Sequence, residues 1–271
     1  MNSTEKLQAQ YLGFINTPCL DINNSNFHYP QIEIDYLKPI DLSKIDPSQH
    51  KRLGKLVEVF FLKNLDQNPQ YTNILNNIQI QPDKHHTLGE IDFICQTPEG
   101  IRHIELAYKF YLYQPNIKNK TERWVGPNLR DALHLKLNKL QTKQFPRLHH
   151  SAFKKELDTH HLCSSEIKQS SHIKTQLYLP LKLKHDKRKP IDLKFISGYY
   201  LSYKNIEYLN SFTQFAIPPK EDWLIQPVHN TQWLNFSEIK PHILEQISKK
   251  HSPLLWAQNK FTVEKYFITF W

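Results

Sequence analysis

Two carboxylates on a predicted β-hairpin are the residues of this sequence best suited to chemistry. Leu88 to Gln96 and Ile101 to Tyr111 have the composition of strands, and Thr97-Pro98-Glu99-Gly100 joins them as a type I turn favours. The register set by this turn places Asp92 directly opposite Glu105. Two facing carboxylates repel each other, and a divalent cation between them removes that repulsion. The hairpin therefore predicts a metal site at Asp92 and Glu105.

A lysine shares the face of the second strand that carries Glu105. Successive side chains of a strand alternate, so Ala107 and Lys109 lie on the face of Glu105, and the residues between them form an apolar face that suits a core. Lys109 lies roughly 13 Å along the strand from Glu105, and its long side chain recovers part of that distance. Lys109 is therefore a candidate catalytic residue. The alternative is an exposed polar face whose charges are unrelated.

These residues resemble a known nuclease motif. Gly89-Glu90-Ile91-Asp92-Phe93, followed after the turn by Ile104-Glu105-Leu106-Ala107, is similar to the motif of the PD-(D/E)XK nuclease superfamily. The resemblance implies that Asp92 and Glu105 bind Mg²⁺ or Mn²⁺, and that the main-chain carbonyl of Leu106 is a third ligand. It also implies a lysine two residues after the Glu that helps to activate water.

The chain departs from that motif at Ala107, which stands where the superfamily has its lysine. Three explanations remain open. The lysine has moved to another position, the active site is altered, or the fold binds nucleic acid without hydrolysing it.

A longer set of residues resembles a bacterial family, the domain of unknown function numbered 1853. The resemblance rests on Gly89 to Asp92, on Glu105 to Tyr111 and on Trp124-Val125-Gly126-Pro127-Asn128, and it covers most of the chain. Because that family has no established function, the resemblance supports the fold more than the mechanism.

The helix predicted before the hairpin supplies one more candidate. Asp46-Pro47-Ser48-Gln49 has the residues of a helix start, and the segment from Lys51 to Leu65 has helical periodicity. Glu58 lies at the edge of its apolar face, where a carboxylate is costly unless it is paired or binds metal. Glu58 is thus either a supporting residue of the site or a boundary residue that reaches solvent.

The helix predicted after the hairpin supplies two more candidate residues of the site. It begins at Gly126-Pro127-Asn128 and continues to about Gln144, and Pro146 ends it. Lys136 and Gln144 fall inside or beside the arc of its buried leucines, so each needs a polar partner. The metal site or a bound phosphate could supply one. Lys136 is therefore a second candidate for the motif lysine, and the alternative is a lysine that snorkels to solvent.

Composition favours a nucleic-acid partner, with DNA the expected one. Lys and Arg number 35 and Asp and Glu 26, which gives a net charge of +9. Excess cations attract phosphates, because each contact releases condensed counterions. Aromatic and basic residues are also interleaved after the hairpin, a pattern that binds nucleic acid or packs a core. The residues concerned are Tyr108, Phe110, Tyr111, Tyr113, Trp124, Lys118, Lys120 and Arg123. If the chain is instead a structural or interaction protein, the charge serves only solubility.

The chain has the features of a cytoplasmic protein. Its first residues, Met1 to Lys6, are polar, and no apolar run approaches the roughly 18 residues that cross a bilayer. Cys19, Cys95 and Cys163 are far apart and odd in number, which fits a reduced compartment. We therefore expect no membrane association, and the oligomeric state stays open.

The fold expected is α/β, with a restriction-endonuclease-like core in which helices flank a central mixed β-sheet. Residues 1–45 would form an irregular arm and residues 46–150 the core. Residues 151–271 would form an α+β extension packed on the core. It would contain strands at Gln176 to Leu183, Leu193 to Leu201 and Tyr266 to Trp271, and a helix from Ser237 to Lys250. The function expected is metal-dependent hydrolysis of phosphodiester bonds in DNA or RNA, and the alternative is nucleic-acid binding on the same fold.

Overall fold

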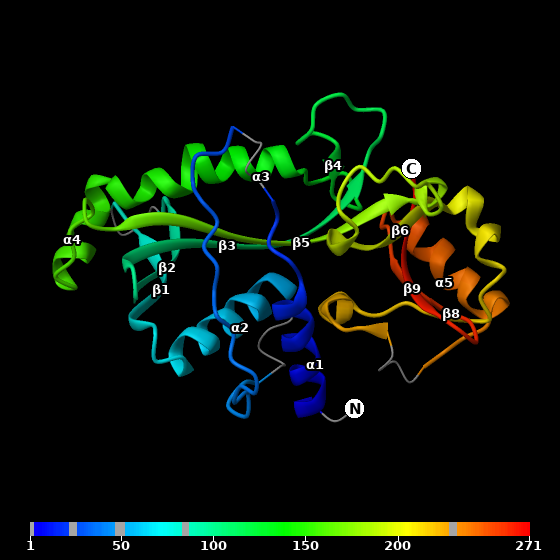
Figure 1. The fold of residues 1–271 in the computed structure, drawn as a ribbon, viewed down its shortest axis with the longest axis horizontal. Helices are drawn as coiled ribbons and strands as arrows, with labels where there is room; N and C mark the ends of the chain where they lie inside the picture. The colour runs from blue at the N-terminus through cyan, green and yellow to red at the C-terminus, as the bar shows by residue number, and fades with distance from the viewer. Residues whose placement is uncertain (1–2, 22–25, 47–51, 83–86, 228–231) are drawn as a thin grey trace.

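The described part of the chain forms one large mixed β-sheet with helices on both faces. The computed structural model describes residues 3–21, 26–46, 52–82, 87–227 and 232–271. Within them nine strands pair in the order β1-β2-β3-β5-β6-β9-β8-β7, and β4 pairs with β3 (Figure 1). The strands are β1 (Thr72–Ile80), β2 (Gly89–Thr97), β3 (Gly100–Tyr113), β4 (Trp124–Val125), β5 (Lys168–Pro180), β6 (Ile196–Ser202), β7 (Gln214–Ala216), β8 (Leu254–Gln258) and β9 (Val263–Thr269).

Both parallel and antiparallel pairs occur, which confirms the α/β class with a mixed sheet. β3, β5, β6 and β9 are parallel neighbours, and antiparallel hairpins extend the sheet at each end. β5 lies beside β3 from the pair Arg102–Lys168 to the pair Leu112–Tyr178. The sheet therefore continues across residue 150, because β5 places a C-terminal segment against the strand that carries Glu105.

The helices divide between the two faces. They are α1 (Ser3–Asn16), α2 (Leu53–Gln67), α3 (Leu133–Lys139), α4 (Ser151–Thr159) and α5 (Phe236–Ser248). α1 and α2 lie below the sheet in Figure 1, and α3 lies above it. Accordingly, the side chains on the two faces of β3 belong to two different buried clusters. Ile104 and Tyr108 pack with the residues of α1 and α2, whereas Ala107 and Tyr111 pack with Leu133 of α3.

α3 does not end as a regular helix. A π-helical turn, Leu140–Gln144, follows it directly, and a 3₁₀ turn, Phe145–His149, follows that. Further 3₁₀ segments lie at Leu181–Leu183, Leu193–Phe195, Tyr203–Leu209 and Lys220–Leu224. The predicted helix after the hairpin is therefore present, but it begins at Leu133 rather than at Gly126, and Pro146 lies inside the 3₁₀ turn instead of ending the helical path.

The predicted hairpin is confirmed in position and in register. β2 and β3 pair from Thr97–Gly100 to Phe93–Ile104. α2 matches the predicted helix from Leu53 onward. The proposed helix start at Pro47-Ser48-Gln49 lies outside the described residues.

The expectation of little regular structure across residues 1–45 is wrong for residues 3–16, which form α1. Leu7, Tyr11, Phe14 and Ile15 are buried along one side of that helix, and this burial stabilises it. The chain after α1 covers the free edge of β5: the main-chain N–H of Leu20 donates to Ile173 O at 2.8 Å. An unpaired strand edge is thereby closed.

Several elements of the C-terminal part were not expected from the sequence. β5 begins at Lys168, eight residues before the predicted start, and α4, β7 and β8 were not predicted. The predicted final strand and the helix near Ser237 are present as β9 and α5, and Asn235 caps the N-terminus of α5. In the described residues no helix is both long enough and apolar enough to span a bilayer.

Candidate functional site

The structure brings Asp92 and Glu105 together on the neighbouring strands β2 and β3. In the β2–β3 register, Asp92 and Glu105 are the next two opposite residues after the pair Phe93–Ile104. Glu105 is 0% exposed and Asp92 is 8% exposed. Asp92 Oδ2 accepts a hydrogen bond of 2.9 Å from the main-chain N–H of Leu106, so the backbone beside Glu105 holds Asp92 in place.

Burial makes both carboxylates hard to ionise in this arrangement. Burial raises the pKa of Asp92 to about 7, and the nearby charge of Glu105 adds to the effect. Burial also raises the pKa of Glu105, although the charges of Lys136 and Arg147 oppose this. Two acids with raised pKa values at one buried place are typical of functional sites, where a cation can bind between them.

A chain of hydrogen bonds from α3 reaches Glu105. Gln144 Nε2 donates to Glu105 Oε2 at 2.5 Å, and Lys136 Nζ donates to Gln144 Oε1 at 3.0 Å. An ammonium group can only donate, so Gln144 must turn its oxygen toward Lys136 and its NH₂ group toward Glu105. Both predicted residues of this helix are therefore at the carboxylate pair. Glu105 and Asp92 attract the Lys136 ammonium, whose pKa burial lowers.

A second chain of hydrogen bonds holds the other oxygen of Glu105. Gln169 Nε2 donates to the carbonyl of Phe145 at 2.7 Å, and a carbonyl can only accept, so the orientation of the Gln169 amide is set. The same NH₂ group contacts His103 Nδ1 at 3.0 Å, which makes Nδ1 an acceptor. His103 Nε2 therefore carries the proton and donates to Glu105 Oε1 at 2.9 Å. Burial lowers the pKa of His103 to about 4, so the ring is neutral.

His103, Gln169 and Arg147 contribute to the site and were not predicted from the sequence. His103 had one available signal, its place two residues before Glu105 on the same strand face. Gln169 lies opposite His103 on β5, and no local pattern could reveal that pairing. Arg147 donates to Glu90 O at 3.3 Å and lies against Gly89, whose φ is 140°. An L side chain rarely adopts this φ, so this part of the motif favours glycine.

Lys109 lies on the predicted strand face but has a different partner. Its Nζ donates to Asp131 Oδ2 at 2.6 Å, and the two side chains are 35% and 36% exposed. Of the two predicted lysines, Lys136 is therefore the one that is hydrogen-bonded into the carboxylate pair.

Packing explains why no lysine could replace Ala107 without rearrangement. Ala107 is 6% exposed and belongs to the same buried cluster as Leu133 and Leu137 of α3. α3 therefore packs directly on Ala107, and the same helix carries Lys136.

Glu58 reaches the border of the site from α2. Its Oε2 accepts from Lys55 Nζ at 2.6 Å. Burial raises the pKa of Glu58, the ion pair with Lys55 opposes this, and the negative charges of Asp92 and Glu90 raise it further. Glu58 therefore lies close enough to Asp92 to act on it electrostatically.

The donor set fits a hard divalent cation that keeps part of its hydration shell. In the described residues no group of three or more His, Cys, Asp and Glu side chains could hold a metal ion. Asp92 and Glu105 supply two carboxylates, and the resemblance to the nuclease motif implies the carbonyl of Leu106 as a third ligand. Mg²⁺ accepts one or two carboxylates and completes its coordination with water and substrate phosphate. Glu105 also has the hydrogen-bonded support that ligating carboxylates usually have.

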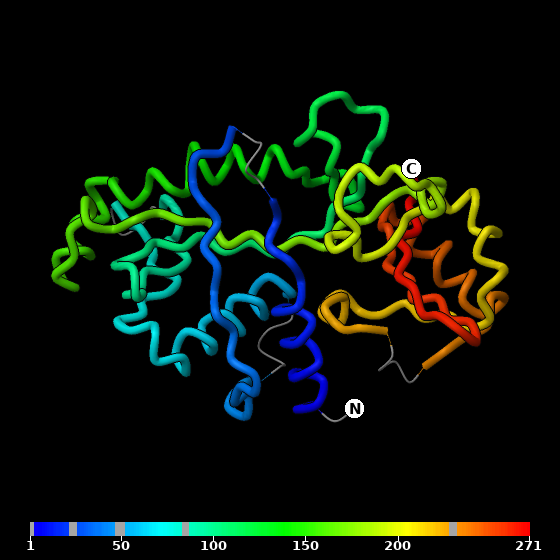
Figure 2. Tube along the Cα trace, in the orientation of Figure 1, coloured from blue at the N-terminus to red at the C-terminus, as the bar shows by residue number. Residues whose placement is uncertain are grey.

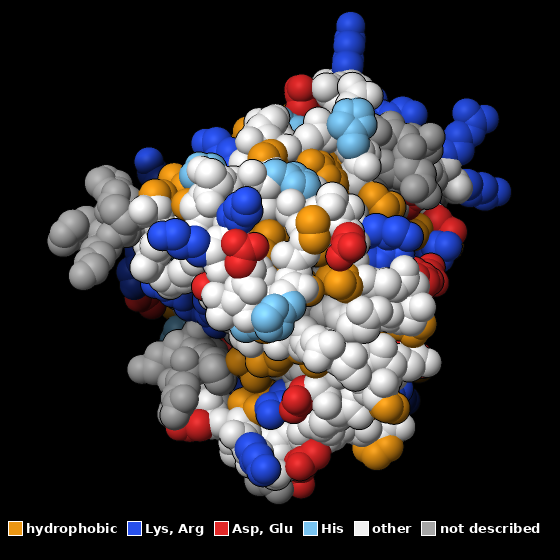
Figure 3. All heavy atoms as spheres, turned by 90° about the vertical axis from the view of Figure 1, so that its left-hand side faces the viewer, with side chains coloured by type: hydrophobic (Ala, Val, Ile, Leu, Met, Phe, Trp, Pro, Cys, Tyr) orange, Lys and Arg blue, Asp and Glu red, His pale blue; other side chains and the backbone are white. Residues whose placement is uncertain are grey.

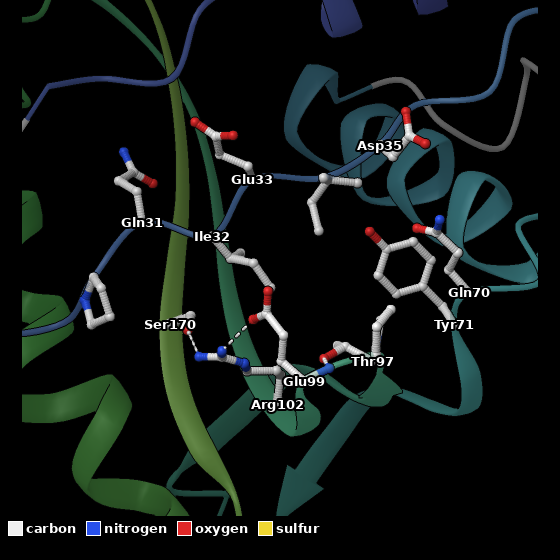
Figure 4. Close-up of a pocket in the computed structure, with 13 residues that line it drawn as sticks. Gln31, Ile32, Glu33, Asp35, Gln70, Tyr71, Thr97, Glu99, Arg102 and Ser170 are labelled. Atoms are coloured by element: carbon white, nitrogen blue, oxygen red, sulfur yellow. Dashed lines mark hydrogen bonds and ion pairs between the residues drawn. The ribbon is translucent and has the colours of Figure 1, made fainter.

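A separate cavity of about 700 Å³ lies at the tip of the hairpin (Figure 4). Arg102 lines it and donates to Ser170 Oγ at 3.1 Å and to Glu99 Oε2 at 2.6 Å. Because Arg102 alternates with His103 along β3, the cavity opens on the sheet face opposite the carboxylates. Neither Asp92 nor Glu105 lines it.

Comparison with known proteins gives one match. A family model described as Domain of unknown function (DUF1853) matches residues 34–266. No curated protein matches the chain, and no solved structure does.

Proposed function

The chain belongs to the family described as Domain of unknown function (DUF1853), and we propose that it is a metal-dependent nuclease with a restriction-endonuclease-like core of the PD-(D/E)XK type. It would hydrolyse phosphodiester bonds in DNA or RNA. The observation that carries the proposal is the continuous contact from Lys136 through Gln144 to Glu105, beside Asp92. It supplies the two carboxylates of the motif together with a lysine that replaces the one missing at position 107.

Each residue has a role that follows from its surroundings. Asp92, Glu105 and the carbonyl of Leu106 would hold the metal, and Glu58 would support the metal or a water molecule from the border. A bound Mg²⁺ or Mn²⁺ would lower the pKa of a water ligand and neutralise charge that develops on the phosphate. Lys136 orients the attacking water or stabilises the negative charge of the transition state, where a partly buried ammonium is most effective. Gln144 fixes the distance between Lys136 and Glu105.

A nucleic-acid-binding protein without hydrolytic activity is the second candidate. Ala107 favours it, because the position of the motif lysine is filled by a packed methyl group. That candidate predicts salt-dependent binding that survives chelation of divalent metal, with no cleavage.

The test is hydrolysis of labelled single- and double-stranded DNA and RNA with Mg²⁺ or Mn²⁺. Asp92→Asn and Glu105→Gln should each abolish cleavage. Glu207→Gln is the matched control, because Glu207 is an exposed carboxylate paired with Lys240 on another part of the chain. Cleavage that persists in both site variants would show that Asp92 and Glu105 are not the catalytic metal ligands. Binding without cleavage in every variant would favour the second candidate.

A further inference from the structure

One stretch of the chain carries most of the surplus positive charge. Residues 132–155 contain six Lys and Arg residues and no Asp or Glu, whereas the net charge of the whole chain is +9. This stretch includes α3, the π-helical and 3₁₀ turns and the first half of α4. This stretch therefore carries a net charge of +6, and it is not one continuous helix, because His150 between the 3₁₀ turn and α4 is extended.

The two sides of this segment differ in their contacts. Lys136 and Arg147 point inward, to Gln144 and to the main chain of Glu90. The other four cations are exposed, and none has an ion pair or a side-chain hydrogen bond in the described part of the chain. We call these four the basic ridge: Lys139, Lys143, Lys154 and Lys155. Exposed lysines elsewhere do find acids, such as Lys240 with Glu207 and Lys249 with Glu245.

The ridge lies over the face of the sheet that carries the candidate site. The segment passes above β2 and β3 in Figure 1, and the tube in Figure 2 shows it running beside them toward the left-hand end. Figure 3 views that end, where Lys and Arg side chains are exposed together with Asp and Glu side chains. Lys136 and Gln144 of the same segment link it to Glu105 on that face.

We propose that the basic ridge binds the phosphate backbone of duplex DNA and thereby brings a strand to the carboxylate pair. The inference rests on the proposed function and deepens it, since it names the substrate and the surface that receives it. The inner side of the segment carries residues of the site and the outer side carries free cations. The same segment therefore positions residues of the site and binds the DNA backbone.

The character of the surface favours a duplex over a single strand. Binding of single strands relies on exposed aromatic rings on which bases stack. Both aromatic residues of the segment, Phe145 and Phe153, are buried, at 0% and 1% exposure. The large exposed aromatics of the described residues are Tyr208 and Phe261, which lie on other elements. The ridge thus offers charge without stacking, and such a surface recognises the closely spaced phosphates of a duplex.

The chemistry of the ridge also favours DNA over RNA. Its side chains are lysines, which neutralise phosphates regardless of base sequence. Recognition of an RNA duplex depends on contacts to 2′-hydroxyl groups across the minor groove, and long flexible ammonium groups supply no fixed partner for them. We therefore expect binding with little sequence preference and strong salt dependence.

The test measures binding in EDTA, so that hydrolysis does not interfere, with a 20-base-pair DNA duplex of mixed sequence. The ridge variant is Lys139→Gln with Lys143→Gln and Lys154→Gln. The matched control is Lys182→Gln with Lys187→Gln and Lys204→Gln, which removes three exposed, unpaired lysines from elsewhere and lowers the net charge equally. The ridge variant should bind roughly 10–100-fold more weakly at 0.1 M salt. Its plot of log K against log salt should be about 2.7 less steep, because three phosphate contacts are lost.

The possible outcomes separate this inference from the proposed function. Equal weakening in ridge and control variants would show that only net charge matters and would overturn the ridge as a binding surface. A single strand of equal length, or an RNA duplex, that binds more tightly than the DNA duplex would overturn the assigned partner. Cleavage by the wild type with an unaffected ridge variant would leave the nuclease proposal standing and remove the ridge. Binding that depends on the ridge, with no cleavage by the wild type, would support the ridge as a DNA-binding surface and remove the nuclease proposal.

Discussion

Lys136 Nζ and Gln144 Oε1 are joined by a hydrogen bond of 3.0 Å although the two residues are eight positions apart on one helical segment. On a regular α-helix a separation of eight residues turns two side chains about 80° apart, whereas a separation of seven leaves them about 20° apart. The π-helical turn at Leu140–Gln144 lies between them and takes up one extra residue. The separation of eight therefore acts as a separation of seven, so Lys136 meets Gln144, whose side chain reaches Glu105.

Lys136→Met should lower the rate of phosphodiester cleavage by about 10²–10³-fold, because it removes the positive charge beside the carboxylate pair. Lys109→Met should change the rate only a few-fold, since Lys109 is paired with Asp131. Rate measurements on both variants with the same duplex decide which lysine replaces the one absent at position 107. A large loss in Lys109→Met with a small one in Lys136→Met would reverse the assignment.

His103→Ala should weaken binding of Mn²⁺ or Mg²⁺ by about 10–100-fold, because one oxygen of Glu105 loses the donor that orients it. Calorimetric titration of the metal measures this without substrate. His149→Ala, at an exposed histidine of the same protein, is the control. Gln169→Leu should reproduce part of the loss, since Gln169 sets the tautomer of His103. Unchanged metal affinity in His103→Ala would remove His103 as a positioning residue.

Asp92→Asn should make the metal-free protein more stable by about 0.5–2 kcal/mol at pH 8, because the buried repulsion with Glu105 disappears. Saturating Mn²⁺ should raise the Tm of the wild type by roughly 5 °C and leave that of Asp92→Asn unchanged. Thermal unfolding in EDTA and in Mn²⁺ tests both statements. A variant that is less stable in EDTA and is still stabilised by Mn²⁺ would contradict them.

Lys265 should make stability increase with pH above neutrality. Burial lowers the pKa of Lys265 to about 8, against 10.5 for the free side chain, and the residue is 5% exposed. Between pH 8 and pH 10.5 the unfolded chain binds more protons than the folded one, so the free energy of unfolding rises with pH in that window. The cost of the buried charge is present in full below pH 8.

Lys265→Met should therefore add about 1–3 kcal/mol to the free energy of unfolding at pH 7 and make its pH dependence between pH 8 and 9.5 shallower. Denaturant unfolding at several pH values measures both effects. Lys260→Met, at an exposed lysine between β8 and β9, should change neither. Equal slopes in the wild type and in Lys265→Met would show that Lys265 is not the source.

The sequence could reveal the hairpin because its information is local. The turn Thr97-Pro98-Glu99-Gly100 sets the register, and alternation then assigns every side chain of β3 to a face. Helical periodicity likewise placed Glu58, Lys136 and Gln144 near buried faces. The contacts of Lys109 were less accessible, because the sequence could state its face but not that Asp131 would lie within 2.6 Å.

The sequence by itself determined the α/β class, the register of β2 with β3 and four residues of the site, which are Asp92, Glu105, Lys136 and Gln144. The tertiary structure alone decided which of them meet. β5 enters the sheet beside β3 from more than fifty residues away and places Gln169 opposite His103, and the π-helical turn rotates Gln144 onto the side of Lys136. Local periodicity contains neither fact, because the first depends on strand pairing between distant segments and the second on a single extra residue in one helical turn.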